Sequence, residues 1–160
     1  MMPRTLAAVI AALLTMTVLA GCSGEASTPD PQDAIAELVV HKTPTCGCCS
    51  DWVEYMREAG FAVEVREQAD LTTVKERVGV PYGLGSCHTA EVAGYFIEGH
   101  VPAEDVARLL TENPDARGLS VPGMPLGSPG MEVPSGEVEP YEVLLVGTDG
   151  QTSVFARHGS

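Results

Sequence analysis

Three cysteines lie within four residues, as Cys46-Gly47-Cys48-Cys49, between a short apolar run and a segment of helical periodicity. The run Leu38-Val39-Val40 predicts a buried strand, and the apolar residues from Trp52 to Ala59 recur at the spacing of one helix face. The cysteines are therefore expected in a loop that leads directly into a helix N-terminus. Such a terminus offers unpaired N–H groups and the positive end of the helix dipole, which both favour thiolate over thiol.

The chain that follows predicts an α/β domain of thioredoxin-like type. Alternating apolar residues from Phe61 to Val65 predict a second strand, and Asp70 is placed to cap a second helix. Two short strands at 86–92 and 94–98 come next, followed by a helix that begins at Pro102. Residues 115–140 are expected to form a long irregular loop before a hairpin at 141–155. The order β-α-β-α-β-β-α predicts a small mixed sheet with helices on both faces, plus a C-terminal loop and hairpin.

The N-terminal residues predict export and membrane anchoring. Arg4 precedes an apolar run at 6–20, which is the pattern of a signal peptide; a retained membrane helix is the alternative, for which the run is short. Leu19-Ala20-Gly21-Cys22 resembles the lipobox of bacterial lipoproteins, so lipidation of Cys22 is expected. We therefore expect a lipoprotein signal peptide at 1–21, a flexible tether at 22–35 and a metal-binding domain at 36–158. This organisation predicts an extracytoplasmic, membrane-anchored protein, either periplasm-facing or at the cell surface.

The charge of the chain excludes one class of partner. Asp and Glu number 22 against 9 Lys and Arg, which gives a formal net charge of −13. An acidic surface repels the phosphate backbone and offers no polybasic patch to anionic lipid. No nucleic-acid partner is expected, and membrane attachment is expected to depend on the lipid anchor.

The cysteine spacing predicts a metal site. Cys46 and Cys49 keep the C-x-x-C spacing of thiol oxidoreductases, but Cys48 stands where those enzymes usually have no thiol. In a thioredoxin-like fold the segment after Pro81 faces the cysteine loop, so Cys87 is expected to join the other three. Soft metal ions gain from every added sulfur ligand. Cys46, Cys48, Cys49 and Cys87 are therefore the predicted metal ligands.

Thiolate crowding favours copper among the soft metals. Thiolates can bridge several Cu(I) ions, whereas zinc bound by four cysteines usually takes two well-separated pairs. We therefore expect Cu(I) in a multinuclear centre. Zinc, an iron–sulfur cluster and redox-active thiols without metal are the alternatives.

Several side chains outside the cysteines also carry donor atoms that could bind copper. Met124 and Met131 in the long loop carry thioethers that suit Cu(I), and His100 precedes the third predicted helix, so these three are weaker candidates. His88 follows Cys87 on a predicted strand, so its side chain is expected on the opposite face, in the core or at the surface. His41 and His158 are expected to be solvated.

Four separated segments together resemble the CopG-type copper-resistance family. They are HKTPTCGCCSDW at 41–52, GSCHTA at 85–90, GYFIEGHVP at 94–102 and GLSVPGMPLGSPGME at 118–132, and the resemblance extends from residue 38 to about 157. It implies a thioredoxin-like fold, Cu(I) held by the four cysteines, a role in copper resistance or homeostasis, and a proposed copper oxidoreductase activity. Copper ions and other copper-homeostasis proteins are the implied partners.

Two other interpretations stay open from the residues alone. The first is an extracytoplasmic thiol–disulfide oxidoreductase that uses the C-x-x-C pair without metal, so whether the chain is an enzyme is left undecided. The second is a disulfide-stapled interaction domain, which the adjacent Cys48 and Cys49 disfavour because a bridge between neighbours is strained.

Overall fold

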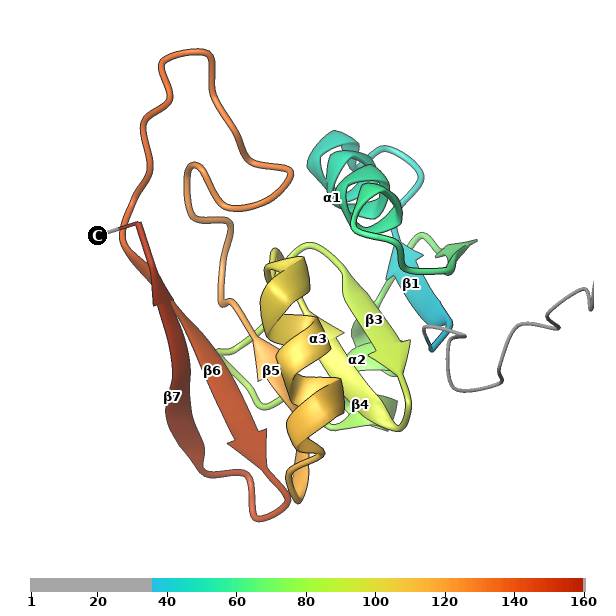
Figure 1. Cartoon of the computed structure of the whole chain (residues 1–160). Coiled ribbons are helices and arrows are strands. Elements are labelled where there is room, and N and C mark those ends of the chain that lie inside the picture. The colour runs from blue at the N-terminus through green and yellow to red at the C-terminus, as the bar shows by residue number, and fades with distance from the viewer. Residues whose placement is uncertain (1–35, 160) are drawn as a thin grey trace, which may run out of the picture.

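A computed structural model describes residues 36–159 (Figure 1). The expected signal peptide, the tether up to residue 35 and Cys22 lie outside the described residues. The described part contains three helices, α1 (Gly47–Glu58), α2 (Thr72–Val78) and α3 (Ala103–Glu112). It also contains seven strands: β1 (Leu38–Lys42), β2 (Val63–Glu67), β3 (Thr89–Val92), β4 (Tyr95–Glu98), β5 (Ala116–Ser120), β6 (Tyr141–Gly147) and β7 (Thr152–His158). Over residues 36–159, no helix has the length and apolarity needed to span a membrane.

The strands form one mixed sheet in the order β2-β1-β3-β4-β5-β6-β7. β1 pairs parallel with β2 and antiparallel with β3, and β3 pairs antiparallel with β4. The element order from β1 to α3 is the predicted one, and the prediction of an α/β fold with a small mixed sheet is confirmed. Thioredoxin-like remains the interpretation that this order suggests.

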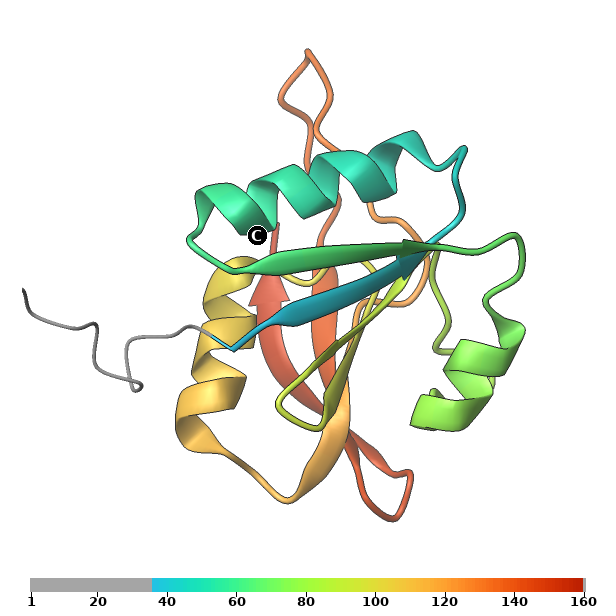
Figure 2. The same cartoon turned by 90° about the vertical axis from the view of Figure 1, so that its right-hand side faces the viewer.

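The helices cover both faces of the sheet, as predicted. Alternation along β3 separates the faces: Ala90 and Val92 join the apolar core, while Thr89 and Glu91 bond to side chains of α2. α1 and α3 share the core face, where the backbone N–H of Ala103 donates to the Tyr55 hydroxyl at 3.1 Å. Figure 2 shows α2 and α3 on opposite sides of the sheet, with α1 running along β1 and β2.

The prediction that residues 115–140 form only an irregular loop is wrong at its start. β5 lies within this range, pairs parallel with β4 and antiparallel with β6, and so joins the C-terminal hairpin to the main sheet. Gly118 permits this pairing because its backbone lies so close to Phe96 on β4 that a Cβ would have no room. Residues 121–140 do form a long irregular connection, and the predicted hairpin is present as β6 and β7.

Candidate metal centre

The cysteine triplet lies at the N-terminus of α1, as the sequence predicts. Cys46 is the N-cap residue in an extended conformation, and its Sγ accepts a hydrogen bond from the backbone N–H of Cys49 at 3.3 Å. This contact satisfies one of the unpaired amides that begin every helix. Trp52, one turn further on, is fully buried and donates from Nε1 to the Val101 carbonyl at 2.9 Å, which fixes the helix against the domain.

The fold brings the four site cysteines together. The Sγ atoms of Cys46, Cys48, Cys49 and Cys87 all lie within 4.8 Å of one another. Cys46 Sγ is 3.5 Å from Cys48 Sγ, and Cys49 Sγ is 3.7 Å from the carbonyl oxygen of Cys87. Cys87, which lies almost forty residues further along the chain, thereby joins the three cysteines of the C-x-C-C segment. A soft metal ion could therefore contact several sulfurs at once.

The cysteines occur in two oxidation states. Cys46 and Cys49 form a disulfide, whereas Cys48 and Cys87 are the free thiols among the four cysteines of residues 36–159. A disulfide sulfur is no thiolate ligand, so binding of a metal by all four cysteines requires a two-electron reduction of this bond. The state of this one bond therefore decides whether the site offers two thiols or four.

The segment that carries Cys87 differs from the prediction. β3 begins at Thr89, not at residue 86, so Cys87 and His88 precede the strand. Strand alternation consequently does not apply to them, and the prediction that His88 faces away from Cys87 is wrong: His88 Nδ1 lies 3.4 Å from Cys87 Sγ. The His88 ring is fully buried, so the expectation of a core position is confirmed. It lies at a tilt against the Trp52 ring, with 4.4 Å between the ring centroids, and its Nε2 has no hydrogen-bond partner within residues 36–159.

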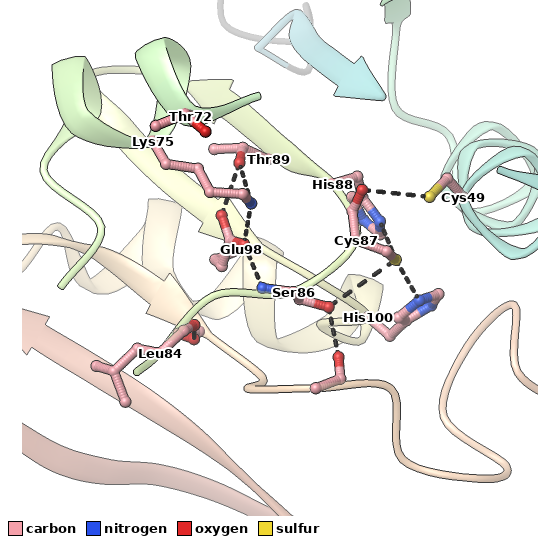
Figure 3. A network of polar contacts seen from close by, with 12 residues as sticks. Cys49, Thr72, Lys75, Leu84, Ser86, Cys87, His88, Thr89, Glu98 and His100 are labelled. Carbon is pink, nitrogen blue, oxygen red and sulfur yellow. Dashed lines mark hydrogen bonds and ion pairs between the residues drawn. The ribbon is translucent and has the colours of Figure 1, made fainter. Parts of the chain in front are cut away.

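His100 is oriented as a potential ligand. Its Nε2 lies 3.1 Å from Cys87 Sγ, and its Nδ1 lies 2.8 Å from the Pro129 carbonyl oxygen. Because a carbonyl oxygen only accepts, Nδ1 carries the proton and Nε2 keeps its lone pair toward the sulfur. Figure 3 shows Cys87 between the two imidazoles, with Cys49 approaching from α1. Cys87, His88 and His100 therefore form a second donor group that shares Cys87 with the four-cysteine group.

The protonation of these groups follows from burial. Burial lowers the pKa of His88 well below its usual value and also lowers the pKa of His100, which favours the neutral form of both rings, the form that binds metal. Burial also raises the pKa of the Cys87 thiol to about 11, and the nearby Cys48 acts in the same direction. A metal ion that binds Cys87 must therefore displace its proton.

A polar network on the α2 side holds the Cys87 segment in place (Figure 3). The fully buried Glu98 carboxylate accepts from the Lys75 ammonium, from the Thr89 hydroxyl and from the backbone N–H of Ser86. The Ser86 hydroxyl in turn donates to the Gly123 carbonyl. Sequence reasoning missed this network, although a glutamate ending the otherwise apolar run at 95–98 was a possible signal.

The long loop packs directly on the cysteine helix. A Cβ on Gly130 would lie 2.7 Å from both the Cys48 carbonyl oxygen and the Trp52 nitrogen, and Gly130 has a left-handed φ of +80°. Met131 follows it and is half-buried, whereas Met124 is 52% exposed. Their role as ligands stays a prediction.

Two histidines differ from their expected exposure. His41 is only 3% exposed, with Nε2 2.9 Å from a Glu91 carboxylate oxygen and Nδ1 2.6 Å from the Gln68 amide, so the prediction of a solvated ring is wrong. His158 is half-buried, with Nε2 2.6 Å from Asp105 Oδ2. Both rings serve structural contacts.

Fold and site together define a small α/β protein with a cysteine- and histidine-lined candidate metal centre at a helix N-terminus. Two solved structures, "Copper resistance protein copG- Form 1" and "Form 2", are 45% identical and superpose with TM-scores of 0.73 and 0.74. Each comparison covers 78% of this chain and 98% of the solved chain. The chain therefore belongs to the CopG copper-resistance protein family.

Residues 84–131, which include Cys87, His88 and His100, match the family described as "Protein of unknown function, DUF411". No curated protein matches the chain.

Proposed function

We propose that this protein binds Cu(I) through its cysteine cluster and serves copper resistance. The observation that carries the proposal is the convergence of four cysteine sulfurs within 4.8 Å of one another. Its solved relatives bear the name of copper resistance proteins, which agrees with this chemistry.

Copper suits this donor set better than zinc. Three of the sulfurs come from four consecutive residues, so they cannot easily take the corners of one tetrahedron around a single zinc ion. Thiolates that lie this close can instead bridge neighbouring Cu(I) ions, and Cu(I) prefers soft sulfur ligands. We therefore favour a multinuclear Cu(I) centre.

The ligands we propose are Cys46, Cys48, Cys49 and Cys87, with the nearest imidazole nitrogens in support. His100 Nε2 and His88 Nδ1 both lie within 3.4 Å of Cys87 Sγ, so either could complete the coordination of a copper ion held by that sulfur. Met124 and Met131 remain lower-ranked ligands in the covering loop.

The proposed location is outside the cytoplasm, at a membrane surface. The signal-peptide pattern of residues 1–21 and the lipobox ending in Cys22 support export and lipid anchoring. Anchored there, the domain would meet incoming copper and any copper-homeostasis proteins in the same compartment.

The test is an anaerobic titration of the fully reduced protein with Cu(I) against a chromophoric chelator. We expect more than one copper per chain, and a large loss of capacity in the double variant Cys46→Ser/Cys87→Ser. The matched control is Cys22→Ser, which removes the proposed lipidation site instead of a proposed ligand and should leave the capacity unchanged. Near-zero copper in the parent protein, or equal binding in the double variant, would contradict the proposal.

The disulfide between Cys46 and Cys49 supports a second candidate function, thiol–disulfide exchange on exported proteins. Cys46 is partly exposed whereas Cys49 is fully buried, so an incoming thiolate would reach Cys46 first. This candidate predicts catalytic disulfide exchange by the metal-free protein that is lost in Cys46→Ser. Absence of any such turnover would exclude it and leave copper binding unaffected.

A further inference from the structure

Two exposed loops of the domain lack charged side chains. Residues 78–90 and 118–131 contain no Asp, Glu, Lys or Arg, although such residues make up 19% of the chain. Within these ranges, every residue of 80–86 and of 122–126 is at least partly exposed. Charged residues ordinarily lie at the surface, so their absence sets these two loops apart from the rest of it. Residues 80–86 and 122–126 are called the collar below.

Hydrogen bonds join the two loops of the collar into one surface. The backbone N–H of Gly123 donates to the Gly85 carbonyl at 3.2 Å, and the Ser86 hydroxyl donates to the Gly123 carbonyl. Figure 3 shows that Leu84 and Ser86 lead directly to Cys87. The collar is therefore a continuous surface that ends beside one sulfur of the candidate metal centre.

Two large apolar side chains project from the collar into solvent. Tyr82 is fully exposed and Met124 is 52% exposed, and no other large apolar side chain of residues 36–159 is as exposed as either. Neither belongs to the apolar core, so packing of the fold does not account for them. At the centres of protein–protein interfaces, charged residues are depleted while tyrosine and methionine are enriched. The collar therefore has the composition of an interface centre.

The collar is also restrained in shape. Pro81 precedes Tyr82, and Pro122 and Pro125 lie on either side of Met124. Each proline fixes its own φ angle, and the hydrogen bonds described above link one loop to the other. Ordering of loops is one of the costs of association, so a surface that is restrained beforehand binds a partner with a smaller loss of entropy.

Unpaired carboxylates border the collar. Glu76 lines a hollow of about 350 Å³ together with Tyr82, and Glu139 lines one of about 590 Å³ together with Met124. Neither carboxylate forms an ion pair within residues 36–159. The Lys75 ammonium, which also lines the first hollow, is held by a buried carboxylate instead. An acidic rim attracts lysine and arginine, and it opposes contact with the same acidic rim of a second copy.

We propose that the collar docks a different exported protein, whose contact surface has an apolar centre and a rim of lysine and arginine. Since the collar ends beside Cys87, the docked partner lies next to the copper site, and in naming a partner for that site the inference rests on the proposed function. Two short loops give a small contact area, which is typical of a transient encounter. The charged rim speeds association, and the apolar centre supplies the affinity.

Photo-crosslinking from the collar tests this proposal in cells that make the protein. Benzoylphenylalanine replaces Tyr82 in the full chain, and the product formed on irradiation is identified by mass spectrometry. The matched control carries the same group in place of Glu112, which is exposed on α3, on the opposite side of the sheet from α2. We expect capture of one exported protein with an excess of lysine and arginine, from position 82 only. Capture of a second copy or of lipid alone, equal capture from both positions, or no crosslink overturns the proposal.

Affinity measurements with the captured protein then test the two parts of the surface. Tyr82→Ser should raise the Kd by about tenfold or more, because an exposed tyrosine at an interface centre carries much of the binding energy. The double variant Glu76→Gln/Glu139→Gln should raise the Kd at low salt and have little effect at high salt, where the charges are screened. An unchanged Kd in either variant at low salt overturns the proposal.

Copper binding separates this inference from the proposed function. Tyr82 is not a proposed ligand and lies outside the core, so Tyr82→Ser should bind Cu(I) with the capacity of the parent protein. If the parent protein binds no Cu(I), the proposed function fails. If the parent protein binds Cu(I) but no protein is captured from position 82, only the present inference fails.

Discussion

Gly130→Ala is expected to disturb both the stability of the domain and its copper site. The new Cβ would lie 2.7 Å from backbone atoms of Cys48 and Trp52, which a packed helix cannot easily move. The left-handed φ costs a non-glycine residue about 1–2 kcal/mol, and overpacking of this kind adds about 1–3 kcal/mol. We therefore expect the free energy of unfolding to fall by about 2–5 kcal/mol.

The effect on copper follows from the neighbouring residue. Pro129 accepts the hydrogen bond that fixes the His100 tautomer, so a displaced loop releases the imidazole from its orientation toward Cys87. Loss of such a supporting contact typically lowers metal affinity about 10–100-fold. Urea denaturation measures the first effect, and Cu(I) competition with a chelator measures the second.

Gly136→Ala is the matched control for this experiment. Gly136 lies in the same loop with φ of +70°, but a Cβ there would meet no atom within 4 Å. The variant should therefore lower the free energy of unfolding only by the about 1–2 kcal/mol that the left-handed φ costs, and it should leave the Cu(I) affinity unchanged. Equal behaviour of the two variants in both assays would refute the claim that the loop positions the site by packing on α1.

Two further predictions concern the α2 face of the sheet. Glu98→Leu leaves the Lys75 ammonium without its carboxylate partner and should lower the free energy of unfolding by about 3–5 kcal/mol. The double variant Lys75→Met/Glu98→Leu should recover much of that loss. Equal unfolding midpoints of the single and double variants in urea would speak against a coupled pair. The hydrogen bond from Arg77, with a further one from His41, lowers the pKa of Glu91 to about 2. Because this pKa lies below the ordinary value of 4.5, the stabilisation that ionised Glu91 provides is complete above about pH 4.5 and is lost as the pH falls toward 2. The melting temperature should therefore depend less on pH over that range in Glu91→Gln than in the parent protein.

The local parts of the site could be predicted from the sequence. The cysteine triplet is placed by a strand, a loop and a helix that are all adjacent in the chain, so periodicity alone located it at the helix N-terminus. The association of Cys87 with the triplet was inferred from an expected topology and not from a local pattern, and the structure does bring Cys87 to the triplet.

Other parts depend on contacts that no local pattern contains. β5 is held by pairing with β4 and β6, and its sequence ARGLS, with Arg117 and Gly118 in its centre, has no apolar alternation that would indicate a strand. The orientation of His88 depends on where β3 begins, because His88 precedes Thr89 and so does not follow the alternation of a strand. The burial of Glu98 depends on Lys75, which comes from a different element.

X-ray absorption at the copper edge of the Cu(I)-loaded protein would show which atoms bind the copper. We expect nearest neighbours that are mainly sulfur and a copper–copper scattering path, since thiolates that lie within 4.8 Å of one another should bridge several ions. A first shell of nitrogen and oxygen without sulfur would contradict the assignment of the cysteine cluster as the copper site.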